Sequence, residues 1–215
     1  MNGSGTAHPI PGVLNISPFV CLHFHPIQYI EMSDLSEELK RARSKWKFRG
    51  QERPEFAEDP GPGQESVWDY PRPPKIDPDS RTVVVQCNGT DVAESGNAIR
   101  ILETAGPPVF YIPQDDIKMN LLRESAGSSI CEWKGPAVYW DVIYNGNRII
   151  NAGWSYPKPF PGYEQIKNYI SFYPAKLDCF VDGEKVRPQP GKFYGGWVTS
   201  EITGPFKGER GSEWW

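Results

Sequence analysis

Histidine is scarce in this sequence and confined to its beginning. Only three of the 215 residues are histidine, at positions His8, His23 and His25. Imidazole titrates nearer to neutral pH than any other side chain, so it is the most frequent general acid or base in enzymes. Any chemistry in the remaining sequence must therefore use carboxylate, Lys, Arg, Tyr or Cys side chains.

Cysteine is also sparse, and its spacing argues against a zinc site. No Cys-x-x-Cys pair occurs among the four cysteines, Cys21, Cys87, Cys131 and Cys179. A structural zinc site usually needs two such pairs, or histidines in place of one of them. We therefore expect free thiols, no metal site and no cofactor.

Long apolar runs are missing as well. The apolar stretch 18–30 is interrupted by His23, His25 and Pro26, and no stretch approaches the roughly 20 apolar residues of a membrane helix. The first residues carry no Lys or Arg, although a secretory signal peptide begins with such charges. We expect a cytoplasmic protein with no membrane partner. The formal net charge of −4 also argues against nucleic acid as the main partner.

Glycine and proline, by contrast, are abundant, with 21 and 22 residues. Three dipeptides, Asn88-Gly89, Asn145-Gly146 and Asp182-Gly183, each separate two runs rich in β-branched and aromatic residues. Such dipeptides favour type I′ turns, which need positive φ at both central residues and connect antiparallel strands. The sequence therefore predicts three hairpins, over residues 83–93, 138–150 and 177–187.

Other local patterns complete the expected fold class. A fourth hairpin is predicted to join residues 98–103 with 109–113 across the corner Gly106-Pro107-Pro108, and a helix that begins at Asn97 is the alternative. Helix is expected in this region only as short pieces, at 114–122 and 162–172. These patterns predict a mainly β protein with a single antiparallel, hairpin-rich β domain, short helices and an N-terminal amphipathic helix.

Composition divides the chain into four segments. Residues 1–31 are predicted to be poorly structured, and residues 32–50 to form the amphipathic helix. Residues 51–65 combine Pro, Gly and acidic side chains without periodicity, which is typical of a linker. The β domain is expected to occupy residues 66–215.

The helical segment carries an apolar stripe beside many basic residues. Asp34 and Glu37 are spaced to cap its start, and Gly50 is a suitable end. Four apolar residues share one face, namely Leu35, Leu39, Ala42 and Trp46. The basic residues between Lys40 and Arg53 allow a nucleic-acid or membrane-surface interpretation, but packing of the stripe on the β domain is the simpler one.

The segment 131–141 concentrates a thiol, a carboxylate, an ammonium and three large aromatic rings. Such groups gather where a chain lines a buried, shaped site. In a strand, Glu132 and Lys134 would point to one face, and Cys131 and Trp133 to the other. Glu132 and Lys134 then form either a pair tuned for proton transfer on a pocket wall or an ordinary surface ion pair.

Other ionisable residues each allow two interpretations. Glu103 ends an apolar run before the proline-rich corner, where it acts either as a general base or as an acceptor that fixes the turn. Cys131 is either a nucleophile or a buried structural thiol, and the lack of a histidine partner favours the thiol. Asp141 is expected to face outward. The candidate catalytic residues are therefore Glu132, Lys134 and Glu103.

Aromatic residues are numerous enough in the β domain to line a ligand pocket. The candidate ligand-binding residues are Cys131 and the rings of Tyr111, Tyr139, Trp140, Trp154, Tyr156, Tyr194 and Trp197. The alternative is that these rings fill the core of the domain. The pair Gly195-Gly196 indicates a bend close to other backbone. Two further rings, Trp214 and Trp215, are expected to pack on the domain or on a partner chain.

Several sequence blocks are shared with a known family. They include Glu65–Pro74, Cys131–Gly135, Trp154–Pro157, Arg187–Gly191 and Phe193–Thr199. From Glu65 to the C-terminus the chain resembles the family named domain of unknown function 427 (DUF427). The resemblance implies a single, mostly β domain that is tent-like or barrel-like and, without Cys-x-x-Cys pairs, free of metal.

The family also carries a nucleotidyltransferase-like label, which the residues do not support. Such enzymes need a Gly-Ser turn followed by an Asp-x-Asp pair that holds metal ions on a triphosphate. The only Asp-x-Asp here is Asp77-Pro78-Asp79, which precedes Gly127-Ser128 and lies before the first hairpin.

Three functional hypotheses follow from the sequence. The first is a small-molecule-binding protein, as a metal-independent enzyme or a binder, with acid–base chemistry in an aromatic-lined pocket. The second is a non-catalytic protein–protein interaction module that includes a homo-oligomer among its possible assemblies. The third is weak nucleic-acid binding through the basic helix.

Overall fold

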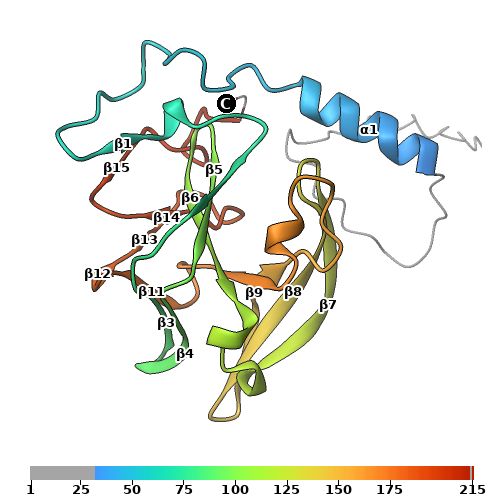
Figure 1. Ribbon diagram of the computed structural model, residues 1–215, viewed down its shortest axis with the longest axis vertical. Helices are drawn as coiled ribbons and strands as arrows, with labels where there is room; N and C mark the ends of the chain where they lie inside the picture. Colours follow the sequence, from blue (N-terminus) through green and yellow to red (C-terminus); the bar gives the residue numbers. More distant parts are fainter. Residues whose placement is uncertain (1–31, 214) are drawn as a thin grey trace, which may run out of the picture.

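The computed structural model describes residues 32–213 and residue 215, and the side chains from residue 36 onward. The prediction for residues 1–31 lies outside this range. Figure 1 shows one helix, α1 (Met32–Ser44), beside a body built from strands. The protein is mainly β and its large sheets are antiparallel, as the sequence predicts.

Seven strands form the larger sheet. Their order is β2 (Lys75–Pro78), β5 (Ile99–Glu103), β6 (Gly106–Pro113), β10 (Tyr169–Phe172), β9 (Asn147–Ser155), β8 (Gly135–Tyr144) and β7 (Leu122–Cys131). A second sheet has the order β12 (Glu184–Lys185), β11 (Asp178–Val181), β3 (Val83–Cys87) and β4 (Thr90–Ser95). One hydrophobic cluster contains side chains of both sheets, so their apolar faces pack against each other.

Short elements complete the described chain. Two small sheets pair β1 (Glu65–Ser66) with β15 (Ile202–Thr203) in parallel, and β13 (Arg187–Pro188) with β14 (Trp197–Val198). Four single 3₁₀ turns are η1 (Val67–Asp69), η2 (Gln114–Asp116), η3 (Met119–Leu121) and η4 (Glu164–Ile166).

The three hairpins predicted from Asn-Gly and Asp-Gly pairs are confirmed as β3–β4, β8–β9 and β11–β12. In each turn both central residues have positive φ, for example 50° at Asn88 and 76° at Gly89. The local requirement for positive φ therefore fixes these connections.

The fourth hairpin is confirmed as β5–β6, but its predicted corner is wrong. The turn is Thr104-Ala105, with Ala105 at φ 69°, and Gly106 already pairs with Glu103. Pro107 and Pro108 lie within β6 beside an irregularity of the ladder, where a strand tolerates residues without an N–H donor.

The helix predictions for the β domain need correction. Residues 162–172 form only the turn η4 and then the strand β10, whose residues pair with β6 on one side and β9 on the other. Residues 114–122 form the two turns η2 and η3. The apolar spacing in 162–172 is compatible with either period, and tertiary pairing selects the strand.

The amphipathic helix is confirmed in a shorter form. It ends at Ser44, so Gly50 at φ 79° lies beyond it. Ala42 and Trp46 of the predicted stripe are buried, and Arg43 donates to the carbonyl of Glu132 at 2.7 Å. The helix therefore packs its apolar side towards the β domain, as the simpler interpretation predicts.

The segment 51–64 has little regular structure, and it contacts the domain. Phe56 stacks on Trp215, with ring centroids 5.0 Å apart, and also meets the edge of Trp68. Trp215 thus packs on its own domain, which is the first of the two predicted positions. The predicted division of the chain into four segments stays a prediction.

Asp141 does not face outward as predicted but is fully buried. The β8–β9 ladder is irregular between Trp140 and Val142, and this irregularity accompanies the inward position of Asp141. Its carboxylate accepts hydrogen bonds from Arg148 Nε at 2.6 Å and from the Asn151 amide at 2.7 Å. Burial raises the pKa of Asp141, but these two partners lower it by more.

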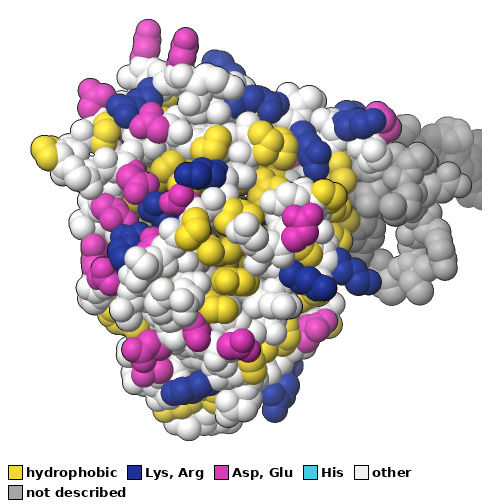
Figure 2. Space-filling view, in the orientation of Figure 1, with side chains coloured by type: hydrophobic (Ala, Val, Ile, Leu, Met, Phe, Trp, Pro, Cys, Tyr) yellow, Lys and Arg dark blue, Asp and Glu magenta, His cyan; other side chains and the backbone are white. Residues whose placement is uncertain are grey.

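Strand alternation in the larger sheet creates a second apolar face. Along β6, Phe110 and Ile112 belong to the core between the sheets, whereas Val109 and Tyr111 belong to another cluster. That second cluster contains many aromatic residues and also Trp46, which follows α1. In Figure 2, hydrophobic side chains gather over the middle of the visible face, with charged side chains around them.

Candidate functional site

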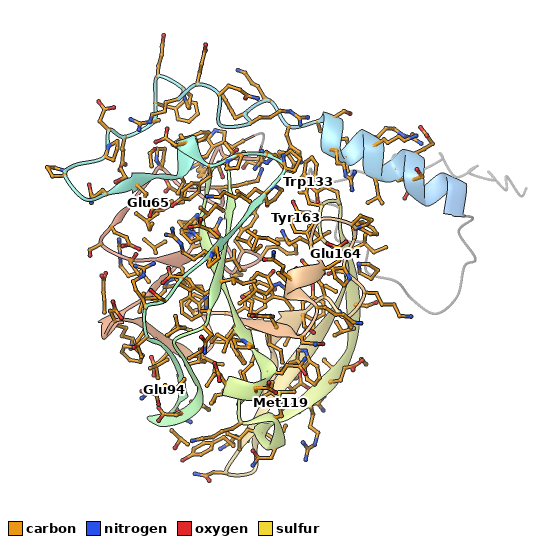
Figure 3. All side chains as sticks on the ribbon, viewed as in Figure 1. Glu65, Glu94, Met119, Trp133, Tyr163 and Glu164 are labelled. Atoms are coloured by element: carbon orange, nitrogen blue, oxygen red, sulfur yellow. The ribbon has the colours of Figure 1, made fainter. Side chains whose placement is uncertain are left out.

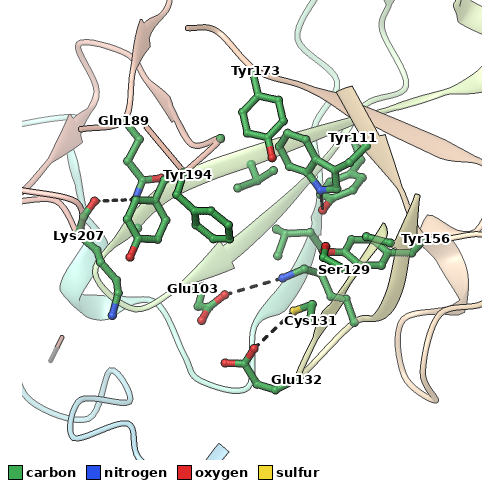
Figure 4. Close-up of a pocket in the computed structure, with 18 of the residues that line it drawn as sticks. Glu103, Tyr111, Ser129, Cys131, Glu132, Tyr156, Tyr173, Gln189, Tyr194 and Lys207 are labelled. Carbon is green, nitrogen blue, oxygen red and sulfur yellow. Dashed lines mark hydrogen bonds and ion pairs between the residues drawn. The ribbon is translucent and has the colours of Figure 1, made fainter. Parts of the chain in front are cut away.

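A cavity lies within the second apolar cluster. Its volume is about 140 Å³, and its lining comes from β5 to β9 together with residues 189–207. Figure 4 shows Tyr194, Gln189 and Lys207 on one side of Glu103, and Tyr111 and Tyr156 on the other. The cavity therefore brings together residues that are far apart in the sequence.

All three predicted catalytic residues line this cavity, although not in the predicted way. Glu132 and Lys134 lie in the turn that connects β7 with β8, so the alternation of a strand does not apply to them. Both are buried nevertheless. The turn is fixed by Gly135 at φ 104° and by a hydrogen bond of 2.9 Å from the Phe160 amide to the Lys134 carbonyl.

Glu103 is held by two cationic side chains. Arg72 Nε lies 3.1 Å from Glu103 Oε1, and Lys134 Nζ lies 3.8 Å from Oε2. The Arg72 guanidinium also donates to the carbonyls of Thr104 and Phe48. One carboxylate is thus shared between two buried cationic side chains.

Glu132 lies where the charged form of a carboxyl group is disfavoured. Burial raises its pKa and the Glu103 carboxylate raises it further, while its own backbone amide, the Lys134 ammonium and the hydrogen bond from Trp46 only partly offset this effect. That bond joins Trp46 Nε1 to Glu132 Oε1 at 3.0 Å. Glu132 is therefore the carboxyl group on this wall whose pKa is shifted in the direction that a general acid needs.

Cys131 lines the cavity next to Glu132, with its sulfur 3.8 Å from Glu132 Oε2. Burial raises the pKa of the Cys131 thiol to about 11, and Lys134 only partly offsets this shift. Because the thiolate is the nucleophilic form, the protonated thiol supports the structural role over the nucleophilic one. The described cysteines Cys87, Cys131 and Cys179 are free.

Lys134 stays an ammonium in this surrounding. Burial alone lowers its pKa, but the groups around it that carry or can take negative charge, chiefly Cys131 and Glu103, raise it by more. The net direction is above the ordinary value for lysine. Lys134 is therefore a permanent positive charge in the cavity wall and a poor base.

Five of the predicted aromatic residues line the cavity, namely Tyr111, Tyr139, Trp154, Tyr156 and Tyr194. Trp154 Nε1 donates to the Tyr111 hydroxyl at 3.0 Å, which fixes both rings. On the opposite strand pair, the hydroxyls of Ser129 and Tyr139 are 2.8 Å apart. These rings form a rigid apolar wall with a few polar atoms.

Trp140 and Trp197 were predicted to bind ligand, and the structure places both of them elsewhere. Trp197 is fully buried in the core between the sheets and donates to the Phe172 carbonyl at 3.0 Å. Trp140 packs against the same core and donates to Ser155 Oγ at 2.9 Å. Tyr139, the neighbour of Trp140 in sequence, lies on the other face of the sheet, because successive strand residues alternate.

Lys207 is a cavity residue that the sequence gave no reason to select. It is buried, and its Nζ lies 4.0 Å from the ring centroid of Trp46 and donates to the Trp215 carbonyl. Burial, and next the positive charge of Arg72, lower the pKa of Lys207 to about 7. Gln189 positions this part of the chain by donating to the Lys207 carbonyl at 2.8 Å.

Trp133, also between the candidate residues in sequence, does not line the cavity. It is buried near Tyr163 in the second cluster, and the Arg43 guanidinium of α1 lies 5.1 Å from its ring centroid (Figure 3). Its position therefore connects the site to the N-terminal helix.

Gly195 allows the wall of the cavity to close. A Cβ at this position would lie 2.3 Å from Cη2 of Trp154, whereas a Cβ at Gly127 would lie 3.6 Å from the Tyr139 ring. We expect Gly195→Ala to lower the free energy of unfolding by about 1–3 kcal/mol through overpacking. Gly127→Ala, the matched control, should change it by less than about 1 kcal/mol. Urea denaturation measures both, and equal effects would contradict the close packing of Trp154.

A family profile described as domain of unknown function (DUF427) matches residues 75–183. This range is just over half of the 215 residues, so the chain belongs to this family. No curated protein matches the chain. The matched range contains Glu103, Glu132 and Lys134, while Arg72, Lys207 and residues 189–195 complete the cavity from outside it.

Two features are absent from the residues that the structure describes. No helix between residue 32 and the C-terminus is long and apolar enough to cross a membrane. Within the same range, no three His, Cys, Asp or Glu side chains lie close enough to hold a metal ion.

Proposed function

We propose that this protein binds a small molecule in the aromatic cavity and transfers a proton to or from it through Glu132. One observation carries the proposal: a single cavity joins two carboxyl groups and a buried ammonium to a wall of fixed aromatic rings. Pockets of this kind, apolar with a few convergent polar groups of shifted pKa, are the usual places of ligand binding and catalysis.

Each charged residue has a distinct part in this proposal. Glu132 is the proton donor and acceptor, because burial and the Glu103 carboxylate raise its pKa above the ordinary value of a glutamate. Lys134 supplies a fixed positive charge that stabilises negative charge on the bound molecule. Glu103 and Arg72 position Lys134 through the shared ion pairs.

The size of the cavity limits the ligand. An engineered protein cavity of about 150 Å³ accommodates benzene. The volume of about 140 Å³ therefore suits a compound with a single ring or a similarly small apolar group.

Native mass spectrometry of the full chain, purified without added ligand, tests the binding step. We expect a small non-covalent adduct on the wild type. Ala137→Leu should lose it, since Ala137 lines the cavity and is buried. Ala126→Leu, on the exposed side of β7, should keep it. An adduct that survives Ala137→Leu unchanged contradicts the assignment of the cavity.

Glu132→Gln tests the proton-transfer step on the molecule identified in this way. The amide keeps the size of the side chain and still accepts a hydrogen bond from Trp46, but it cannot carry a proton. We expect turnover to fall about 10²- to 10⁴-fold while the dissociation constant stays within about threefold. Unchanged turnover in a variant that binds normally removes Glu132 from the mechanism.

The interaction-module and nucleic-acid hypotheses stay predictions. Arg43 and Arg49 of the basic stretch make contacts within the chain, to the carbonyls of Glu132 and Arg43 respectively.

A further inference from the structure

The Lys134 ammonium is the most unusual polar group of the cavity. Its side chain is only 10% exposed, and its nearest acceptor is Glu103 Oε2 at 3.8 Å, which is too far for a hydrogen bond. No other acceptor within the described residues makes a hydrogen bond or an ion pair with Nζ. An ammonium has three N–H donors, and leaving them unfilled in a buried site is costly.

Acceptors on the cavity wall near Lys134 have other partners. Glu103 Oε1 accepts from Arg72, and Glu132 Oε1 accepts from Trp46. The Tyr111 hydroxyl accepts from Trp154. A bound molecule with oxygen atoms in the cavity would therefore give Lys134 hydrogen-bond acceptors that these groups do not provide.

The charges around Lys134 favour a negative occupant. Two fixed cations, Arg72 and Lys134, share the single carboxylate of Glu103. Glu132 offsets this positive charge less than an exposed carboxylate would, because burial and Glu103 raise its pKa. Lys207, on the same lining, carries a further positive charge when protonated. This end of the cavity therefore has an excess of positive charge, which one carboxylate on a bound molecule would neutralise.

The remaining lining sets the shape of the occupant. Tyr111, Trp154 and Tyr156 form an apolar wall beside Lys134, with the Tyr111 and Tyr156 ring centroids 6.4 Å apart. Rings on such a wall favour a flat apolar partner. The volume of about 140 Å³ again corresponds to one ring.

We propose that the cavity binds a planar, single-ring compound that carries one carboxylate, with the carboxylate oxygens accepting hydrogen bonds from Lys134 Nζ and the ring against Tyr111, Trp154 and Tyr156. This inference rests on the proposed function and names the ligand class of the same site. Hydrogen bonds between an ammonium and a carboxylate are roughly twice as strong as those between neutral groups, which makes the charge of the ligand decisive.

Three single-ring probes of similar size separate charge from shape, namely benzoate, benzamide and benzylamine. Each is titrated into the full chain labelled with ¹⁵N, and the tryptophan indole signals are followed, with that of Trp154 assigned from Trp154→Phe. We expect benzoate to bind in the low-millimolar range, as a small ligand of this kind does. Benzamide should bind about tenfold more weakly or worse, and benzylamine most weakly.

Lys134→Met, which keeps the length and apolar stem, should weaken benzoate binding to the level of benzamide and leave benzamide unchanged. Lys158→Met is the matched control, since Lys158 is exposed close to the same turn, and it should leave both affinities unchanged. The comparison of the three probes on the wild type needs no variant, so it decides the matter even where Lys134→Met does not fold.

The outcomes separate the two proposals. Benzamide or benzylamine binding as tightly as benzoate overturns the carboxylate inference, but it leaves a small-molecule cavity in place. Benzoate binding that Lys134→Met does not weaken also overturns it. If none of the three probes moves the Trp154 indole signal at 20 mM or so, about tenfold above the expected dissociation constant, the cavity itself is no single-ring binding site and the proposed function fails with the inference.

Discussion

Replacing Arg72 with alanine is expected to lower the free energy of unfolding by about 3–5 kcal/mol. The guanidinium is buried and is shared among Glu103 and the carbonyls of Phe48 and Thr104. It also lies 4.2 Å from the ring centroid of Trp46. Alanine leaves the largely buried Glu103 carboxylate without its closest cation, and it removes the hydrogen-bond donor of the Phe48 and Thr104 carbonyls. Removing one partner of a buried ion pair is costly, because the other charge stays buried and unpaired.

Arg53→Ala is the matched control for this prediction. Arg53 makes a two-bond contact with Asp69, at 2.7 and 2.6 Å, but both partners are largely exposed. Exposed ion pairs contribute about 0–1 kcal/mol. Urea denaturation at neutral pH measures both variants. A loss below about 1 kcal/mol for Arg72→Ala, equal to that of Arg53→Ala, would show that Arg72 does not hold the cavity wall together.

Lys207→Met is expected to remove a pH dependence of stability. The pKa of Lys207 is lowered to about 7 in the folded protein, whereas an unfolded lysine titrates near about 10.4. Between these values the unfolded chain holds a proton that the folded chain has lost. Stability therefore rises with pH in this window, by at most about 1.4 kcal/mol per pH unit. Below pH 7 this group contributes no slope.

The measurement is the free energy of unfolding of wild type and variant at several pH values. Methionine has no proton to lose, so the free energy of unfolding of the variant does not rise through this group. The value for the variant minus that for the wild type should therefore fall by about 2 kcal/mol between pH 7.5 and pH 9. The groups that face Lys207, namely Arg72, Glu103, Glu132 and Glu213, are present in both proteins, and the difference isolates Lys207. Lys158→Met, at an exposed lysine, should follow the wild type at every pH. A difference that does not change with pH would place the Lys207 pKa near its ordinary value.

The parts of the fold that sequence predicts are those that local chemistry decides. The Asn88-Gly89, Asn145-Gly146 and Asp182-Gly183 turns need only their own two residues to adopt positive φ, and all three hairpins form. The strand β10 was predicted as helix, because pairing with β6 and β9 decides its conformation and is invisible in a short window. Asp141 was expected outside for a similar reason, since the irregular ladder near it depends on the partner strand.

The sequence predicts the candidate catalytic residues of the site, but not all of the residues that complete its lining. Glu103, Glu132 and Lys134 stand out in the sequence, because they are ionisable residues within or beside apolar and aromatic runs, where burial shifts pKa values as it does at functional sites. Arg72 and Lys207 belong to segments rich in proline and glycine, where no periodicity indicates which way a side chain points. Only the fold brings them to the wall formed by the DUF427 match, together with Trp46 from the N-terminal segment.

A crystal structure of the full chain grown with benzoate would show whether the cavity holds a carboxylate against Lys134. We expect the ring between Tyr111, Trp154 and Tyr156, with a carboxylate oxygen at hydrogen-bond distance, about 2.7–2.9 Å, from Lys134 Nζ. A cavity that holds no benzoate at saturating concentration, or a benzoate whose carboxylate points away from Lys134, would contradict it.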